Sequence, residues 1–388
     1  MNKKNYLLGG IIIILLVFFI SSFISSSEYT YNISNATSTL KTQKKEVKHL
    51  KTPEPLKAVY MTACVAGTPS LRDRLVKLVE ETEINSIVID IKDYTGTVSH
   101  ELNSIGTGCK VSDMREFLES LHDKNIYTIG RVTVFQDPAY SKFHPELAVK
   151  KKSDKNEVWK DRKGISFIDV GARPFWDYIL NITTSSYALG YDEINFDYIR
   201  YPSDGDMSDI YFSHTGTTTK KEMLKQFFEY LDKKIKVENK NIVTSADLFG
   251  MTTTNTDDLN IGQILESALL NFDFVAPMVY PSHYPPKFNG WPDPNKVPYE
   301  IIKFSMNGAV ARVNFLKQEI ASSSPNSYLL KRLGPQQLRP WLQDFDYPVP
   351  YTSAMVRTQI QATYDVGLTS WMLWDPSNKY TKEVLLEN

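Results

Sequence analysis

The stretch YDEINFDYIRYPSDG, at residues 191–205, has the composition of a strand that ends in a loop. Five polar or charged side chains lie among residues suited to burial: Asp192, Glu193, Asn195, Asp197 and Arg200. A buried charge is costly unless another group pairs with it or uses it. The stretch therefore predicts either an internal network of ion pairs or the floor of an active site.

Short apolar runs alternate with segments of helical periodicity on both sides of this stretch. Eight runs are predicted strands, at residues 57–65, 86–93, 127–135, 193–202, 242–250, 273–284, 338–345 and 368–376. The predicted helices lie at residues 69–83, 111–125, 172–190, 219–239, 261–271, 301–320 and 353–366. Eight βα repeats are typical of a (β/α)8 TIM barrel, an α/β fold, here with enlarged loops. A doubly wound open sheet is the alternative, which the lack of an early Gly-rich phosphate-binding turn disfavours.

The alternation of side chains along each strand assigns the polar residues to one face. In the strand at 193–202, one face is predicted to turn toward the helices and consists of Ile194, Phe196 and Tyr198. The other face is predicted to turn toward the barrel interior and consists of Glu193, Asn195 and Asp197. Four charged residues on neighbouring strands also turn inward: Asp90, Lys92, Arg131 and Asp247. The sequence thus predicts a polar barrel interior in which Lys92 and Arg131 pair with the internal acids.

Depth along the strands separates the expected roles of these acids. Asp197 lies five residues before Pro202, and Asp247 lies three residues before Gly250, so both come late in their strands. Barrel enzymes place their chemistry at the C-terminal ends of the strands. Asp197 and Asp247 are therefore predicted to be the reactive pair, whereas Glu193, Asp90 and Arg131 are predicted to support it.

Two carboxyl groups at a barrel mouth are the machinery of glycoside hydrolysis, in which one acts as nucleophile or base and the other as acid. Neighbouring strands lie about 4.8 Å apart, which favours the short carboxyl separation of retaining enzymes. Predicted substrate contacts are Arg200, Tyr280, His283, Asp344 and Trp374, and Asp344 or Asp375 is a candidate third acid. The alternative is an internal ion-pair network without chemistry.

Other chemistries find little support in the sequence. The six histidines show no metal-binding spacing, two cysteines cannot form a zinc site alone, and neither a G-x-S-x-G elbow nor a P-loop occurs. We therefore expect no metal and no cofactor. The net charge of −1 and the lack of a basic stripe give no indication of nucleic-acid binding. Cys64 and Cys109 either form one disulfide or remain free.

The first 55 residues differ from the rest of the chain. Leu7–Ile24 contains no charge and as a helix is about 27 Å long, close to the thickness of a bilayer core. Lys3 and Lys4 precede it, so the positive-inside rule places the body of the protein outside the cytoplasm. We predict a signal-anchor at 1–27, a flexible linker at 28–55 and the barrel at 56–388. A cleaved signal peptide is the alternative.

Five segments carry a resemblance to a known family: EINFDYIRYPSDG, SADLFG, APMVYPSHY, LRPWLQDF and WMLWD. In this order they resemble the bacterial putative glycoside hydrolase domain family of exported proteins, which is related to the α-amylase-like barrel glycosidases. The resemblance spans Leu56 to Tyr380 and implies a TIM barrel with glycosidase activity. It places Asp197 at the strand-four aspartate of the related enzymes, Asp247 where amylase-type enzymes have Glu, and Asp344 as a further acid.

The sequence-based hypothesis is a membrane-tethered, extracytoplasmic glycosidase that acts on a cell-surface or extracellular polysaccharide. Asp197 is the predicted nucleophile and Asp247 the predicted general acid/base. The main alternative is a non-catalytic glycan-binding or scaffold protein on the same barrel. A polysaccharide deacetylase would require a cluster of metal ligands, which the sequence does not provide.

Overall fold

Eight parallel strands form a closed barrel in the computed structural model, which describes residues 47–101 and 104–387. The order of neighbours around the barrel is β1-β10-β9-β8-β7-β5-β3-β2, and β1 closes it against β10. The strands are β1 (Lys57–Met61), β2 (Ser86–Lys92), β3 (Tyr127–Thr133), β5 (Glu193–Asp197), β7 (Val243–Phe249), β8 (Phe274–Met278), β9 (Trp341–Gln343) and β10 (Trp371–Trp374). The predicted barrel and the position of all eight strands are confirmed.

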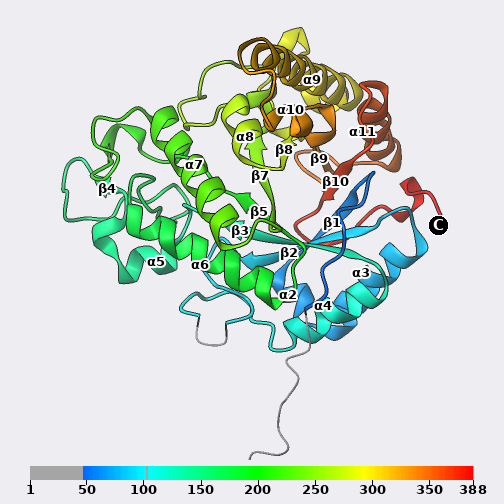
Figure 1. Ribbon diagram of the computed structural model, residues 1–388, viewed down its shortest axis with the longest axis horizontal. Helices are drawn as coiled ribbons and strands as arrows, with labels where there is room; N and C mark the ends of the chain where they lie inside the picture. Colours follow the sequence, from blue (N-terminus) through cyan, green and yellow to red (C-terminus); the bar gives the residue numbers. More distant parts are fainter. Residues whose placement is uncertain (1–46, 102–103, 388) are drawn as a thin grey trace, which may run out of the picture. The chain divides into compact units, whose positions relative to one another are not determined.

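Helices surround the barrel strands (Figure 1). They are α2 (Ala63–Ala66), α3 (Pro69–Glu81), α4 (Met114–Asp123), α5 (Pro138–Phe143), α6 (Arg173–Leu189), α7 (Lys220–Glu238), α8 (Leu265–Asn271), α9 (Pro298–Ser323), α10 (Leu329–Arg332) and α11 (Ser353–Asp365). In the described part of the chain, β10 is followed by a 3-10 turn at Lys382–Val384 and by no α-helix.

Helix α7 illustrates why the sequence folds this way. The Thr219 hydroxyl oxygen accepts a hydrogen bond from the backbone N–H of Glu222, so a side-chain cap begins the helix. Leu224, Phe227 and Leu231 recur at intervals of three and four residues and are fully buried. This apolar stripe seats the helix against the strands.

The apolar residues form two separate layers on the strands. The larger layer lies between strands and helices and includes Ile194 and Phe196 of β5 and Ala246 of β7. The smaller layer includes Val88, Ile129 and Trp341 and comes from the opposite faces of their strands. Polar residues share this inner face, as predicted, so the barrel interior combines an apolar layer with charged groups.

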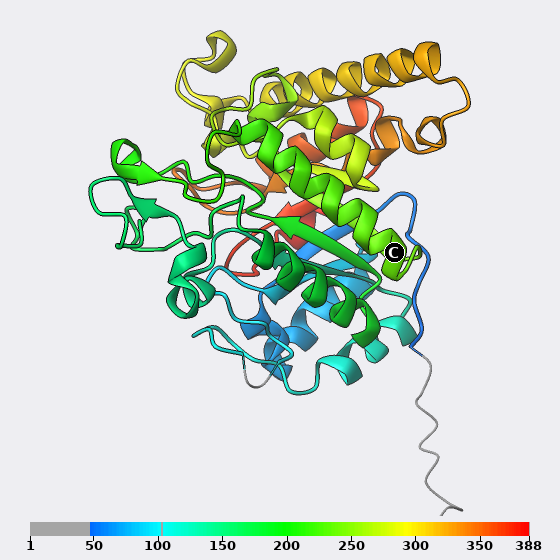
Figure 2. The ribbon, with the colours of Figure 1, turned by 60° about the vertical axis from the view of Figure 1, so that its left-hand side comes forward.

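Two long loops extend the barrel on one side. The segments after β3 and β5 contribute β4 (Lys150–Lys151) and β6 (Ile210–Tyr211), which pair antiparallel and project to the left in Figure 2. Cys64 in α2 and Cys109 in the loop before α4 form a disulfide. The sequence had left this pairing open.

The N-terminal boundary of the barrel domain differs from the predicted one. Residues 47–55 were predicted to end the flexible linker, but they pack against the barrel. The backbone N–H of Leu50 donates to Asp192 Oδ1 at 2.6 Å, and the hydroxyls of Thr52 and Tyr127 are 2.9 Å apart. The predicted signal-anchor at 1–27 and the linker up to residue 46 lie outside the described residues. Within residues 47–101 and 104–387, no helix is long and apolar enough to cross a membrane.

Candidate active site

Asp197 and Asp247 occupy equivalent positions at the carboxyl ends of β5 and β7. Phe196 pairs with Ala246 across the two strands, so the next residues, Asp197 and Asp247, lie at the same level. Because Phe196 and Ala246 pack toward the helices, the aspartates that follow them turn to the interior. Both carboxyl groups line a cavity of about 280 Å³. The predicted inward orientation of the pair is therefore confirmed.

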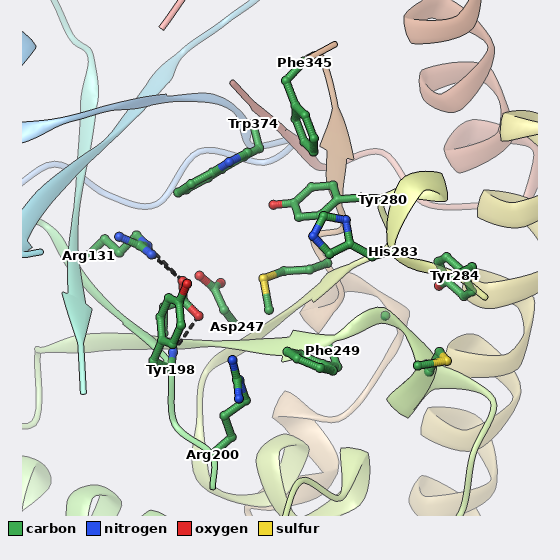
Figure 3. Close-up of a pocket in the computed structure, with 14 residues that line it drawn as sticks. Arg131, Tyr198, Arg200, Asp247, Phe249, Tyr280, His283, Tyr284, Phe345 and Trp374 are labelled. Atoms are coloured by element: carbon green, nitrogen blue, oxygen red, sulfur yellow. Dashed lines mark hydrogen bonds and ion pairs between the residues drawn. The ribbon is translucent and has the colours of Figure 1, made fainter. Parts of the chain in front are cut away.

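Asp197 is held by an ion pair with Arg131 of the neighbouring strand β3. Nε and Nη2 of Arg131 donate to Asp197 Oδ2 at 3.1 and 2.5 Å, and the backbone N–H of Tyr198 donates to Oδ1 at 2.6 Å. Dashed lines mark these contacts in Figure 3. Nη1 of the same arginine donates to Asp90 Oδ1 at 2.8 Å. Arg131 thus fixes the position of Asp197 and supplies the opposite charge that a buried carboxylate requires.

Asp247 has a different environment. Its Oδ1 accepts hydrogen bonds from Asn195 Nδ2 and Trp341 Nε1, both at 2.9 Å, and no described residue donates to its Oδ2. Burial raises the pKa of Asp247 well above its usual range, and the charge of Asp197 raises it further. The protonated form of Asp247 therefore persists to higher pH than that of an exposed aspartic acid, and Figure 3 shows the side chain directed into the cavity.

The two carboxyl groups thus have environments that separate their chemical properties. Asp197 is paired with a guanidinium, whereas burial and the charge of Asp197 raise the pKa of Asp247. Such a pair can supply a nucleophile or base on one side of a bond and a proton donor on the other. This is the arrangement that hydrolysis of an acetal requires.

Aromatic side chains form the wall of the cavity opposite these acids. Tyr280, which follows β8, contacts the ring of Phe345 edge to face, with 5.6 Å between centroids. Trp374 stacks on Tyr60, with 3.9 Å between the ring centroids. The guanidinium of Arg131 lies 5.0 Å from the centroid of the Trp374 ring. Figure 3 shows Trp374, Tyr280 and Phe345 on one side of the cavity. Flat apolar rings next to hydrogen-bonding groups are typical of small-molecule binding pockets.

His283 lies beside Tyr280, with 5.2 Å between the ring centroids. Burial lowers the pKa of His283, so its imidazole is neutral at neutral pH. Its Nδ1 is 3.0 Å from the hydroxyl of Ser282. The ring thus offers a neutral hydrogen-bonding group at the cavity wall.

Arg200 lies on the other side of the cavity, in the loop that follows β5. Its guanidinium is 5.2 Å from the ring centroid of Tyr198 and 4.7 Å from that of Phe249. Nη1 donates to the carbonyl oxygen of Tyr201 at 3.1 Å and to Ser203 Oγ at 3.0 Å. These contacts hold the arginine in a fixed position at the cavity.

A second, wider cavity of about 970 Å³ adjoins the first. Four residues line both cavities: Arg131, Tyr198, Arg200 and Trp374. The second cavity also reaches Tyr94, Lys163 and both cysteines of the disulfide. Because they share these residues, the two cavities lie next to each other, and we call them together the cleft.

Six of the seven predicted site residues line the first cavity. They are Asp197, Arg200, Asp247, Tyr280, His283 and Trp374. Asp344, the seventh, lines neither cavity. Its carboxylate accepts hydrogen bonds from the hydroxyl and the backbone N–H of Thr381, at 2.6 and 2.9 Å. Asp375, the other candidate third acid, accepts from the backbone N–H and hydroxyl of Ser377. Both aspartates therefore hold loops in place.

Two further expectations need correction. Lys92 does not pair with the barrel acids, because a register shift between Asp90 and Lys92 turns it outward. Its Nζ lies 2.8 Å from Asp137 Oδ2. Tyr198 does not face the helices, because β5 ends at Asp197 and Tyr198 adopts a left-handed backbone with φ of 51°. This turn brings the Tyr198 ring to the cavity instead.

Several residues of the site were not predicted. Trp341 is one of the aromatic residues that the sequence offers for a cleft wall, but its hydrogen bond to Asp247 was not predicted. Phe249, Met278 and Phe345 also line the first cavity. Phe249 follows Asp247 by two residues and so continues the inward face of β7, which is a signal that strand alternation provides. Phe345 lies after the end of β9, and no periodicity predicts its orientation there. Within the described part of the chain, no group of three or more His, Cys, Asp or Glu residues could hold a metal ion.

Comparison with known proteins places the chain in a family. Residues 58–380 match the model of a family described as "Putative glycosyl hydrolase domain". The chain belongs to this family. Membership in the glycosyl hydrolase domain family confirms the resemblance found in the sequence and the assignment to the glycosidase class. No curated protein matches in sequence.

Solved structures with related folds include the glycoside hydrolase domain of PgaB (BpsB) from Bordetella bronchiseptica. It is 14% identical, with a TM-score of 0.57 over 85% of this chain and 99% of that chain. An α-L-fucosidase from Paenibacillus thiaminolyticus is 9% identical, with a TM-score of 0.55 over 85% and 47% of the two chains. A hypothetical protein from Ruminiclostridium thermocellum is 31% identical, with a TM-score of 0.43 over 52% and 98%. The first two of these structures share the barrel fold with this chain.

Proposed function

We propose that the protein is a glycoside hydrolase that cleaves O-glycosidic bonds of a polysaccharide by a retaining mechanism. The observation that carries the proposal is the acid pair at one level of β5 and β7. Asp197 is ion-paired with Arg131, whereas burial and the charge of Asp197 raise the pKa of Asp247. Retaining glycosidases need one ionised and one protonated carboxyl group at close range.

In the first step, the Asp247 carboxyl donates its proton to the glycosidic oxygen as the bond from that oxygen to the anomeric carbon breaks. A carboxylate oxygen of Asp197 forms a bond to the anomeric carbon from the opposite face. In the second step, the Asp247 carboxylate takes a proton from a water molecule, whose oxygen attacks the anomeric carbon and releases Asp197. No metal or organic cofactor enters either step.

A polymeric substrate is supported by the shape of the cleft. The first cavity has a volume of about 280 Å³, and the adjoining one of about 970 Å³ extends the cleft past Trp374 and Tyr198. A single sugar at the acids would leave the second cavity empty. A chain of sugars can occupy both.

The proposed location is the outer side of the cell membrane, with the barrel tethered through residues 1–27. The support is the uncharged run Leu7–Ile24 with Lys3 and Lys4 before it. Intact cells treated with an external protease should lose the barrel domain while retaining cytoplasmic markers. Recovery of the barrel in the culture medium, shortened at its N-terminus, would instead indicate a cleaved signal.

The function is tested with the full chain, kept in a polyoxyethylene detergent that contains no glycosidic bond. A panel of glycans is offered to the wild type and to Asp197→Asn, Asp247→Asn and Asp344→Asn, and new reducing ends and glycan binding are measured together. We expect cleavage by the wild type, a loss of about 10²–10⁴-fold in kcat in Asp247→Asn, and a loss at least as large in Asp197→Asn.

Asp344→Asn is the matched control, because Asp344 also lies at a strand end and is buried but lines neither cavity. It should retain activity within about threefold. Binding of a glycan by every variant with cleavage by none, the wild type included, would identify a glycan-binding protein instead. Unaltered cleavage by Asp197→Asn would remove the proposed nucleophile.

A further inference from the structure

Arg200 is a charged group in the cleft that has no carboxylate partner among the described residues. Three acids are near enough to act on it electrostatically: Asp197, Asp161 and Asp204. Each has other partners. Asp197 pairs with Arg131, Asp204 pairs with Arg162, and Asp161 accepts the backbone N–H groups of Lys163 and Ile165. Burial lowers the pKa of Arg200, which indicates that its charge is poorly compensated within the protein.

The free donors of Arg200 form a fork. Only Nη1 donates to described residues, namely to Tyr201 and Ser203. Nε and Nη2 have no acceptor in the part of the chain that the structure describes. These two nitrogens lie on the same side of a guanidinium and match the two oxygens of a carboxylate. Arg131 contrasts with this, because all three of its nitrogens donate to Asp90 or Asp197.

The position of Arg200 directs this fork into the cleft. Tyr198 and Phe249 hold the guanidinium between their rings, and Figure 3 shows it pointing toward the centre of the first cavity, on the same side as Asp247. Arg200 lines both cavities. A sugar placed with its anomeric carbon at Asp197 therefore has Arg200 within the same cavity.

We propose that Arg200 binds a carboxylate on a sugar next to the bond that is cleaved, so that the substrate is an acidic polysaccharide containing uronic acids. The inference rests on the proposed function, because it names the substrate class of the same site. A carboxylate is favoured because it is planar and carries one charge, as the unpaired guanidinium does. The bidentate pair forms in a partly desolvated site, where a charge-assisted hydrogen bond is strong.

The test uses pairs of glycans that differ only in the carboxylate. Oligomers of galacturonate, glucuronate, mannuronate and guluronate are each compared with the carboxyl-reduced neutral form. The full chain is used as wild type, Arg200→Gln and Arg162→Gln, and kcat and KM are measured by reducing ends. Arg162 is the matched control, since it is an exposed arginine of the loop before α6 that pairs with Asp204 of the loop containing Arg200.

We expect the wild type to prefer an acidic member over its reduced form by about 10²-fold in kcat/KM, because reduction leaves the partly buried guanidinium unpaired. Arg200→Gln should lose about 10²-fold on that acidic glycan and at least tenfold less than this on the neutral one, which abolishes the preference for the acidic glycan. Arg162→Gln should keep the wild-type preference. Equal losses by Arg200→Gln on both members would overturn the inference and leave the glycosidase intact. A preference of the wild type for the neutral glycans would do the same.

Binding separates this inference from the proposed function. Asp247→Asn and Asp247→Asn/Arg200→Gln are titrated calorimetrically with the same oligomers. If Asp247→Asn binds an acidic oligomer selectively and the double variant does not, the carboxylate site is supported. This holds even if the wild type cleaves no glycan, a result that would refute only the hydrolase. If no acidic member binds more tightly than its reduced form, the carboxylate site is refuted.

Discussion

Replacement of Trp341 by Phe tests how the barrel sets the pKa of Asp247. Trp341 is fully buried, and its Nε1–H donates to Asp247 Oδ1 at 2.9 Å. This hydrogen bond lowers the pKa of Asp247 and so partly offsets the effect of burial. Trp341→Phe removes the donor and keeps an aromatic ring, so the pKa of Asp247 should rise further. The protonated form, which the proposed mechanism requires, then persists to higher pH.

The size of the effect follows from the difference between two hydrogen bonds. A bond to a charged acceptor contributes about 1.5–3 kcal/mol, and a bond to a neutral one about 0.5–1.5 kcal/mol. Trp341→Phe therefore destabilises the ionised form of Asp247 by about 1–1.5 kcal/mol more than the neutral form. Since 1.36 kcal/mol corresponds to one pH unit, the alkaline limb of the kcat/KM profile should move upward by about one pH unit.

The assay is the pH dependence of kcat/KM on the glycan that the wild type cleaves best, since this profile reports the free enzyme. Trp371→Phe is the matched control. Trp371 is equally buried on the neighbouring strand β10, and its Nε1 donates to the Tyr364 hydroxyl at 3.0 Å, away from the acids. The control should lose comparable stability and keep the wild-type profile. An alkaline limb that stays in place in Trp341→Phe, or moves to lower pH, would refute the reasoning.

Two more predictions concern stability. Glu193 and Arg339 form an ion pair of 2.9 Å in the barrel, and both side chains are nearly inaccessible to solvent. Glu193→Gln should lower the free energy of unfolding in urea by about 3–5 kcal/mol, because it leaves Arg339 unpaired. An unchanged urea midpoint would contradict this. Burial raises the pKa of Asp344 to about 6, so the folded state binds the Asp344 proton more tightly than the unfolded state does. The free energy of unfolding therefore falls as pH rises from about 4 to 6. Asp344→Asn should remove that loss, so that its stability relative to the wild type improves between pH 4 and pH 7 by up to about 3 kcal/mol; a relative stability that is constant across this range would show that Asp344 is not responsible.

The barrel and its reactive pair were predictable because strand alternation and position depend on local sequence. Phe196 and Ala246 face the helices, which suffices to turn Asp197 and Asp247 inward. Alternation fails where the backbone leaves the strand geometry. The left-handed turn at Tyr198 and the register shift before Lys92 each reverse the predicted side of a residue.

The partners of the charged residues were harder to predict because they are distant in sequence. Arg339 reaches Glu193 across 146 positions, and Asp344 is bound by Thr381, 37 residues further on. Asp344 follows the end of a strand, as a catalytic acid of a barrel would, but its carboxylate accepts hydrogen bonds from Thr381. Position along a strand thus identified candidate acids, and only the three-dimensional contacts separated those that face the cleft from those that hold a loop.

The central claim, that Asp197 attacks the anomeric carbon, is tested most directly by trapping the covalent intermediate. Asp247→Ala lacks the base for the second step, so with an activated aryl glycoside of the preferred sugar the glycosyl-enzyme should accumulate. After acid quenching and peptic digestion, mass spectrometry should find the sugar attached to the Asp197 carboxylate. An adduct on a different residue, or no adduct together with a product of inverted anomeric configuration from the wild type, would contradict the account.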